Sequence, residues 1–129
     1  MKKGAPIEIP IRKEPLLPED AELIRGGLAE FQALKDSVDR TFSTYGVYGF
    51  STFCIPGLTP YQVKAQKWQI NQHKLRVAKV STIRALNYGI IASFSPHHYT
   101  IVINSPLTQT IYSVIDSAFS PPFDVRFST

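Results

Sequence analysis

The chain has 129 residues, of which 43% are hydrophobic and 19% are charged, as is usual for a folded domain with a substantial core. No apolar run approaches the ~20 residues of a membrane-spanning helix. The basic N-terminus lacks the apolar segment of a secretory signal. Cys54 is the single cysteine, so an internal disulfide is excluded. We therefore expect a cytoplasmic protein without a membrane partner, in which Cys54 is buried in an apolar strand and unreactive.

The net charge of +4 is unevenly distributed along the chain. Residues 1–40 carry seven basic and eight acidic side chains, whereas residues 41–129 carry seven basic and two acidic ones. No Asp or Glu lies between Asp39 and Asp116, and six of the seven basic residues of that span fall between Lys64 and Arg84. This asymmetry indicates an anionic partner, namely nucleic acid, a phosphorylated ligand or an acidic protein. The plainer interpretation is a basic surface that keeps the protein soluble.

The first 40 residues are predicted to form an arm followed by a helix. Residues 1–18 contain four of the ten prolines and no apolar period, which favours an extended arm that the fold does not need. A single domain then covers residues 19–129. Acidic residues from Glu19 favour the start of a helix, Gly26 weakens it, and a firmer helix is expected over residues 28–41.

The rest of the chain alternates strand and helix signals. We predict a strand over 45–55, a helix from Thr59 and Pro60, a strand over 75–80 and a short helix over 81–88, capped by Ser81 and closed by Gly89. We then predict a hairpin of strands 90–94 and 98–103, a helix between 104 and 120, and a short edge strand over 123–127. The order α-β-α-β-α-β-β-α with short connections predicts a single α+β domain with a mixed sheet.

Three stretches of this pattern are distinctive. They are GFSTF at residues 49–53, STIRALNYG at 81–89 and PHHYTIVI at 96–103. Together they resemble short uncharacterised bacterial proteins, over about the central half of the chain. The resemblance implies a bacterial or phage origin and implies no activity.

Two adjacent histidines, His97 and His98, lie at the start of the last long strand. Residues 98–101 (HYTI) are similar to half of the signature of two-histidine phosphoesterases, but His73 does not begin a second such tetrad. In an enzyme, His98 or His97 would act as general acid or base. In a non-catalytic protein, His98 would be a hydrogen-bonded structural residue at the strand start.

The basic span offers a candidate anion-binding surface. A strand end feeds a helix start at residues 79–84, where backbone N–H groups and hydroxyls favour phosphate, although the glycines of a nucleotide-binding loop are missing. A lysine stripe on the preceding predicted helix would extend this surface for phosphate backbones. Solvated charges and ordinary helix capping are the alternatives. The anion-binding candidates are Lys64, Lys67, Lys74, Arg76, Lys79, Ser81, Thr82 and Arg84.

The scarcity of acidic, cysteine and histidine residues in this chain excludes some classes of enzyme and metal site. Metal-dependent nucleases need clustered carboxylates, and zinc sites need more cysteine and histidine ligands than this chain offers, so we expect no metal and no cofactor. The favoured hypothesis is a small basic non-catalytic module that binds nucleic acid through its basic face, or a protein through the arm and the aromatic strand. The alternative is a metal-free, ribonuclease-like bacterial toxin with an acidic antitoxin, in which His98 works beside Arg76, Lys79 or Arg84.

Overall fold

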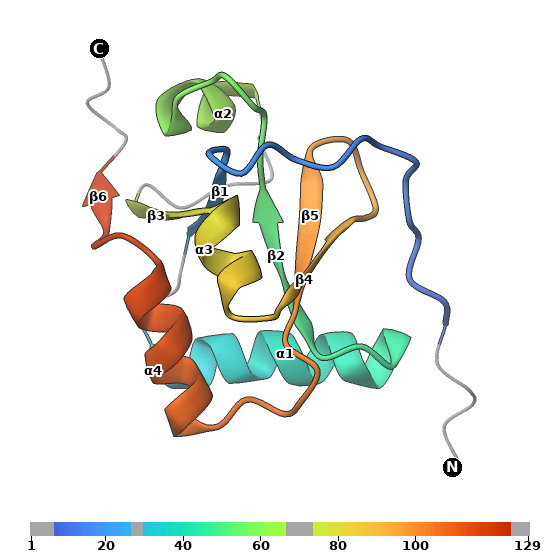
Figure 1. The fold of residues 1–129 in the computed structure, drawn as a ribbon. Helices are drawn as coiled ribbons and strands as arrows, with labels where there is room; N and C mark the ends of the chain where they lie inside the picture. Colours follow the sequence, from blue (N-terminus) through green and yellow to red (C-terminus); the bar gives the residue numbers. More distant parts are fainter. Residues whose placement is uncertain (1–6, 27–29, 67–73, 125–129) are drawn as a thin grey trace.

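The computed structural model describes residues 7–26, 30–66 and 74–124, which form one α+β domain, as the sequence predicts (Figure 1). Among these residues no helix has the length and hydropathy needed to cross a membrane. The elements are, in chain order, β1 (Glu22–Gly26), α1 (Phe31–Tyr45), β2 (Gly49–Phe53), α2 (Pro60–Gln66), β3 (Lys74–Lys79), α3 (Val80–Ala85), β4 (Gly89–Ala92), β5 (His98–Val102), α4 (Gln109–Ala118) and β6 (Phe123–Asp124).

The strands form one sheet in the order β4-β5-β2-β1-β3-β6, and each described pair of neighbours is antiparallel. The mixed sheet of the sequence prediction is therefore not formed. Strands β2 and β3 do run in the same direction, on either side of the connection through α2. Strand β1 lies between them and is antiparallel to both, so they do not pair with each other.

Strand β1 replaces the helix that was predicted from Glu19. Leu23 and Ile24 are 0% and 1% exposed, and they are buried in different clusters on the two faces of the sheet. Two consecutive buried residues suit a central strand, whereas the acidic residues around them favour a helix start. Burial on both faces overrides the local helix signal, and the prediction was wrong here for that reason.

The helices cover the two faces of the sheet unequally. Helices α1, α3 and α4 contribute to one cluster, in which Leu34, Ile83 and Ile115 pack with Phe50. Helix α2 packs on the other face, where Val63 joins a smaller cluster with residues of β1 and β3. In Figure 1, α1 crosses the bottom of the view and α2 lies at the top, with the strands between them.

The start of α2 follows the prediction. The Thr59 hydroxyl accepts a hydrogen bond from the Gln62 backbone N–H (3.2 Å), and the Gln62 side chain accepts one from the Thr59 N–H (2.9 Å). This reciprocal pair is a capping box. The last helix begins later than its proline suggested, because Thr108 caps it by accepting from the Ile111 N–H at 3.2 Å.

The short helix after β3 departs from the prediction at both ends. Helix α3 begins at Val80, so Ser81 lies inside its first turn and does not cap it. The left-handed residue that follows the helix is Asn87, with φ of 64°, and Gly89 begins β4 instead. A short Asn tolerates this conformation, and Gly is not required.

The described part of the arm, residues 7–18, contains no helix and is packed against the domain. Its backbone pairs with the outer edge of β4 through a bridge between Ile11 and Ser93, and the Arg12 N–H donates to the Ala92 carbonyl at 2.9 Å. Ile9 and Leu17 are 7% and 6% exposed. The arm therefore covers a sheet edge that would otherwise present unpaired backbone groups.

Candidate functional site

His98 is enclosed at the start of β5. It is 8% exposed, and its ring meets Phe53 and Phe94 edge-on, each with a centroid distance of 5.2 Å. Its Nδ1 lies 3.1 Å from the hydroxyl and from the carbonyl oxygen of Ser93, and the Ser93 hydroxyl lies 2.7 Å from that of Thr100. This arrangement fits the structural interpretation of His98, because a general acid or base must reach a substrate.

His97 occupies the turn between β4 and β5. Its φ of 69° is left-handed, as is the φ of 60° at Phe94. The His97 carbonyl accepts a hydrogen bond from the Cys54 N–H at 2.9 Å, which ties the turn to the end of β2. Cys54 is 1% exposed, and burial, followed by the charge of Glu22, raises the pKa of its thiol to about 11. The thiol is therefore protonated at neutral pH, in line with the expected unreactive cysteine.

Arg76 has a structural role at the C-terminal end of α4. It is 7% exposed, its guanidinium pairs with the Asp116 carboxylate at 2.7 Å, and it donates to the backbone carbonyls of Asp116 (2.9 Å) and Ser120 (2.6 Å). A cation there satisfies carbonyls that a helix end leaves unpaired and faces the negative end of the helix dipole. Arg76 is thus removed from the predicted basic surface.

The predicted anion site at the start of α3 is filled by the chain itself. The backbone N–H groups of Val80 and Ser81 donate to the carbonyls of Ala21 and Glu19, both at 2.9 Å. Arg84 pairs with the Glu19 carboxylate and donates to the Leu17 carbonyl at 3.2 Å. The segment that precedes β1 therefore occupies the positions at which a phosphate was expected.

The lysine candidates do not share one face. Lys74 begins β3 and does not continue a helix, and in the sheet it lies opposite Asp124. Lys79 ends β3 on the other face, opposite Glu22. Lys64 is half-buried on α2, and Thr82 is exposed on α3. Lys67, like His73, lies outside the described residues. The candidates therefore form no continuous surface among the residues that the structure describes.

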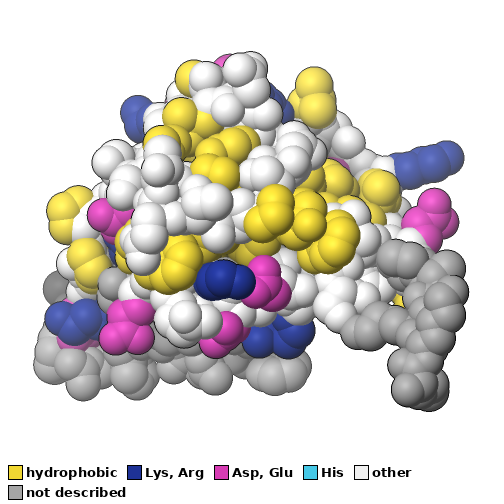
Figure 2. All heavy atoms as spheres, turned by 90° about the horizontal axis from the view of Figure 1, so that it is seen from below, with side chains coloured by type: hydrophobic (Ala, Val, Ile, Leu, Met, Phe, Trp, Pro, Cys, Tyr) yellow, Lys and Arg dark blue, Asp and Glu magenta, His cyan; other side chains and the backbone are white. Residues whose placement is uncertain are grey.

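Charges on the α1 side are also mixed in sign. Figure 2 views the molecule from this side and shows Lys and Arg groups next to Asp and Glu groups, between patches of hydrophobic side chains. On α1, the Lys35 ammonium nitrogen and the Asp39 carboxylate oxygen are 2.6 Å apart. This face therefore presents no large area of one charge.

Sequence reasoning missed the role of Arg12. From the arm, its Nη1 donates to the carbonyls of Ser93 (2.7 Å) and His98 (2.9 Å) and also to that of Ser95, while its Nε pairs with Glu14 at 2.9 Å. The guanidinium carbon lies 5.3 Å from the centre of the Tyr99 ring. One arginine thus holds the arm, the β4–β5 turn and β5 together. No local pattern marks this role, since the carbonyls that Arg12 binds lie more than 80 residues away along the chain.

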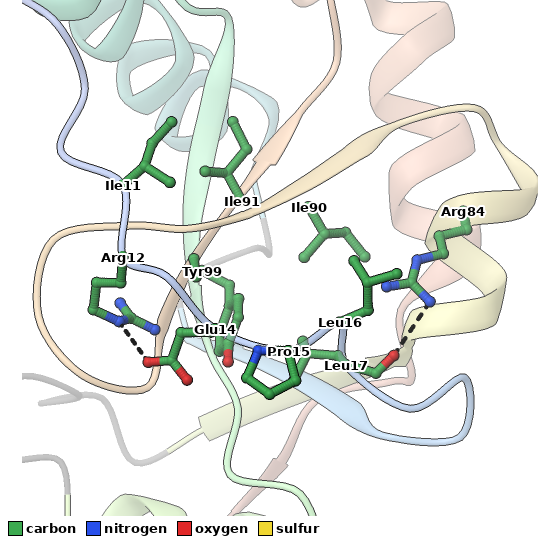
Figure 3. Close-up of a pocket in the computed structure, with 11 residues that line it drawn as sticks. Ile11, Arg12, Glu14, Pro15, Leu16, Leu17, Arg84, Ile90, Ile91 and Tyr99 are labelled. Atoms are coloured by element: carbon green, nitrogen blue, oxygen red, sulfur yellow. Dashed lines mark hydrogen bonds and ion pairs between the residues drawn. The ribbon is translucent and has the colours of Figure 1, made fainter.

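A pocket of about 190 Å³, the under-arm pocket, lies between the arm and the sheet (Figure 3). Arg12, Glu14 and Tyr99 lie toward one end, and Arg84 lies at the other, where it reaches the Leu17 carbonyl. Burial raises the pKa of Tyr99, and Glu14 adds to this while Arg12 opposes it. The aliphatic part of the lining is formed by Ile11, Leu16, Leu17, Ile90, Ile91 and Ala92. The pocket therefore combines an Arg12–Glu14 ion pair at one end and Arg84 at the other with an aliphatic lining.

No family model, no curated protein and no solved structure matches the chain. The resemblance to short bacterial proteins therefore stays a prediction. Among the described residues, no three His, Cys, Asp or Glu side chains are grouped as they would be around a metal ion.

Proposed function

We propose that this protein is a small, basic, non-catalytic interaction module and that it binds another protein through its arm. The single cysteine supports placing it in a reducing compartment, the cytoplasm. The observation that carries the proposal is the exposure of three aliphatic side chains on this anchored segment. Ile7, Ile11 and Leu16 are 65%, 64% and 85% exposed.

The anchoring of the arm supports a role in binding. Ile9 and Leu17 are buried on either side of Arg12, and Pro10 and Pro15 restrict the backbone between and beside them. An extended segment that is already ordered pays little further conformational entropy when it binds. Isolated exposed aliphatic residues are ordinary on protein surfaces, but three of them along twelve residues of a fixed arm suit insertion into an apolar groove.

The internal pairing of the basic residues disfavours nucleic acid as the partner. Arg76 and Arg84 are held by Asp116 and Glu19, and both also bond backbone carbonyls. Non-specific binding to nucleic acid depends on cations that are available to phosphates. Internal ion pairs do not change the net charge of the chain, which is +4. This positive charge favours an acidic protein with an apolar groove as the partner.

The alternative, a metal-free ribonuclease-like toxin, finds less support. It requires His98 to be open to solvent beside a basic group, whereas His98 is enclosed by Phe53 and Phe94 and bonded to Ser93. Arg76, one of its three expected cationic partners, is occupied at the end of α4. A catalytic role for His98 would need this packing to open.

The test begins with a photo-crosslinking residue at position 16 of the full chain, which identifies the protein in contact with the arm in cells. The affinity of that purified protein is then measured by calorimetry for wild type, for an Ile11→Ser, Leu16→Ser variant and for Val114→Ser. Val114 is a matched control because it is an exposed aliphatic residue on α4, 38% exposed.

We expect the arm variant to weaken binding by about tenfold or more, which corresponds to ~1.4 kcal/mol, and the control to bind as wild type does. Equal affinities for all three proteins would overturn the proposal. The proposal would also be overturned if the wild-type protein bound oligonucleotides with an affinity that falls steeply with salt, and if a Lys74→Ala, Lys79→Ala variant lost this binding.

A further inference from the structure

The edge of β4 that faces the under-arm pocket carries unpaired backbone groups. At Ser93 the backbone N–H donates to the His98 carbonyl of β5 at 3.0 Å. Backbone groups alternate in direction along an antiparallel strand, so those of Ile90 and Ala92 point away from β5. The Ala92 carbonyl accepts from the Arg12 N–H of the arm. The Ile90 N–H, the Ile90 carbonyl and the Ala92 N–H have no hydrogen-bond partner among the described residues.

The arm approaches this strand edge and then leaves it. It pairs with β4 through the bridge between Ile11 and Ser93, but beyond Arg12 no backbone hydrogen bond joins it to β4 within the described part of the chain. Leu16 of the arm and Ile90 of β4 line the pocket from its two sides (Figure 3). The pocket is thus a gap beside the row of hydrogen bonds that the arm begins. An open strand edge of this kind is a template for a further extended chain.

The charges around the pocket favour a neutral ligand. Arg12 pairs with Glu14 at 2.9 Å, and Arg84 at the other end pairs with Glu19. Both arginines of the lining have a carboxylate partner, so neither an anion nor a cation gains a strong Coulombic attraction there. A peptide group is neutral. It supplies the acceptor that the Ile90 N–H lacks and the donor that the Ile90 carbonyl lacks.

The volume and lining of the pocket suit one aliphatic residue. At about 30 Å³ for each water-sized group, a volume of about 190 Å³ holds about six such groups, which is close to the size of a valine or a leucine residue. Leu17, Ile90 and Ala92 offer an aliphatic surface on which its side chain would be buried. Ile11 and Leu16 also line the pocket and are exposed, so a protein that contacts them is placed to insert such a residue.

We propose that the under-arm pocket receives one aliphatic residue of the partner protein, which adds an extended segment to the free edge of β4. The N–H of this residue donates to the Ile90 carbonyl, and its carbonyl accepts from the Ile90 N–H. Its side chain packs against Leu17 and Ala92. This pairing rests on the proposed function, because the partner that contacts Ile11 and Leu16 supplies the residue. The two proteins then hold each other reciprocally, since each inserts aliphatic side chains into the other.

The test uses N-acetyl-leucine N-methylamide, a single leucine residue with a peptide group on each side. Methylation of the leucine nitrogen gives a control probe without the N–H that would donate to Ile90, and the asparagine analogue keeps the side-chain shape but is polar. Binding to the full chain is measured from backbone amide signals in NMR titrations. We expect the leucine probe to shift signals of residues 12–17 and 90–92. It should bind about fivefold more tightly than the methylated probe and about tenfold more tightly than the asparagine probe.

Two variants locate the probe in the protein. Ile90→Pro removes the outward N–H of an edge strand, where proline is tolerated, and we expect it to weaken binding about fivefold, whereas Ile90→Val should bind as wild type does. Ala92→Val narrows the pocket and should weaken binding about tenfold, while Thr110→Val on α4 should leave it unchanged. If Ile90→Pro does not fold, the methylated probe still tests the same pair of hydrogen bonds from the ligand side.

The proposal is overturned if the leucine probe does not bind, if the three probes bind alike, or if Ile90→Pro and Ala92→Val both fold and retain wild-type affinity. None of these outcomes depends on the partner protein, whose contact with Ile11 and Leu16 is tested separately by the serine variant. A leucine probe that binds as expected, together with a partner that ignores the serine substitutions, would support the pocket and overturn the arm as the binding surface.

Discussion

Arg76 and Asp116 form an ion pair of 2.7 Å that joins β3 to the end of α4, and the two partners differ greatly in exposure, at 8% and 48% of their side chains. Removing the buried partner leaves carbonyls of the helix end unsatisfied, whereas removing the exposed one leaves Arg76 its backbone acceptors. We expect Arg76→Ala to lower the free energy of unfolding by about 3 kcal/mol and Asp116→Ala by about 1 kcal/mol.

Denaturant unfolding followed by circular dichroism measures both values, with Lys79→Ala as a control at the exposed end of the same strand. The control should stay within about 0.5 kcal/mol of wild type. Equal losses for Arg76→Ala and Asp116→Ala would show that Arg76 stabilises the protein through its ion pair with Asp116 and not through the carbonyls of the helix end.

The arm should matter for stability, contrary to what its composition alone predicts. Arg12→Ala removes the donor for three carbonyls of the β4–β5 turn, so we expect a loss of about 2–3 kcal/mol, against almost none for the exposed neighbour in Lys13→Ala. A chain that begins at Glu19 should lose still more, since Ile9 and Leu17 are then gone as well. Thermal unfolding of the three proteins decides the question, and an unchanged melting temperature for the truncated chain would restore the simpler view of a dispensable arm.

His98 should act on stability and not on catalysis. His98→Ala deprives Ser93 of one hydrogen-bond partner and removes a ring packed between Phe53 and Phe94, which should cost about 1–2 kcal/mol. His97→Asn should be nearly neutral, because Asn accepts the left-handed backbone that His97 adopts. Melting temperature and RNA cleavage are measured on the same samples. Cleavage by the wild type that is lost in a folded His98→Ala protein would revive the ribonuclease hypothesis.

The buried thiol of Cys54 should make stability fall at high pH. Its pKa rises from 9.0 to about 11 on folding. A group with a raised pKa stabilises the folded state below its unfolded pKa, and this contribution is lost as pH increases through the folded value. We therefore expect unfolding to become easier between about pH 9 and 11, by up to ~2.5 kcal/mol.

The part of this loss that belongs to the thiol should be missing in Cys54→Ala, and comparison of the two pH profiles measures it. The half-buried Tyr88 and the buried Tyr99, whose pKa values are also raised by burial, act in the same direction and remain in both proteins. Identical pH profiles of stability for the two proteins would show that ionisation of the Cys54 thiol does not contribute to the loss.

Gly49 allows β2 to approach β5 closely. A Cβ atom at this position would lie 2.7 Å from the Ile101 carbonyl oxygen and 2.7 Å from the Thr100 methyl group, whereas one at Gly89 would lie 3.5 Å from the Val102 Cβ. Gly49→Ala should therefore destabilise the protein by about 1–3 kcal/mol, and Gly89→Ala should be neutral or slightly stabilising. Urea unfolding of both variants tests the contrast, which a similar stability for the two would contradict.

Local signals accounted for the elements that were predicted correctly. Thr59 and Pro60 mark the start of α2 through a cap that closes within three residues, and the β4–β5 hairpin follows from two apolar runs around a short turn. The position of α1 followed from apolar spacing, although the helix runs from Phe31 to Tyr45, four residues beyond the predicted end. Such signals depend on neighbours along the chain, so they are readable without the fold.

The sequence by itself determined the α+β class, most of the element order and a buried, unreactive Cys54. The tertiary structure decided that Leu23 and Ile24 form a central strand, that Arg76 closes α4 and that Arg12 holds the β4–β5 turn. The residues joined by these arginines lie 40 and 81 or more positions apart. The folded backbone decides which group a charged side chain meets. The sequence shows only that the residue is charged, and an arginine that binds a phosphate in solution cannot be told from one that binds a carbonyl within the fold.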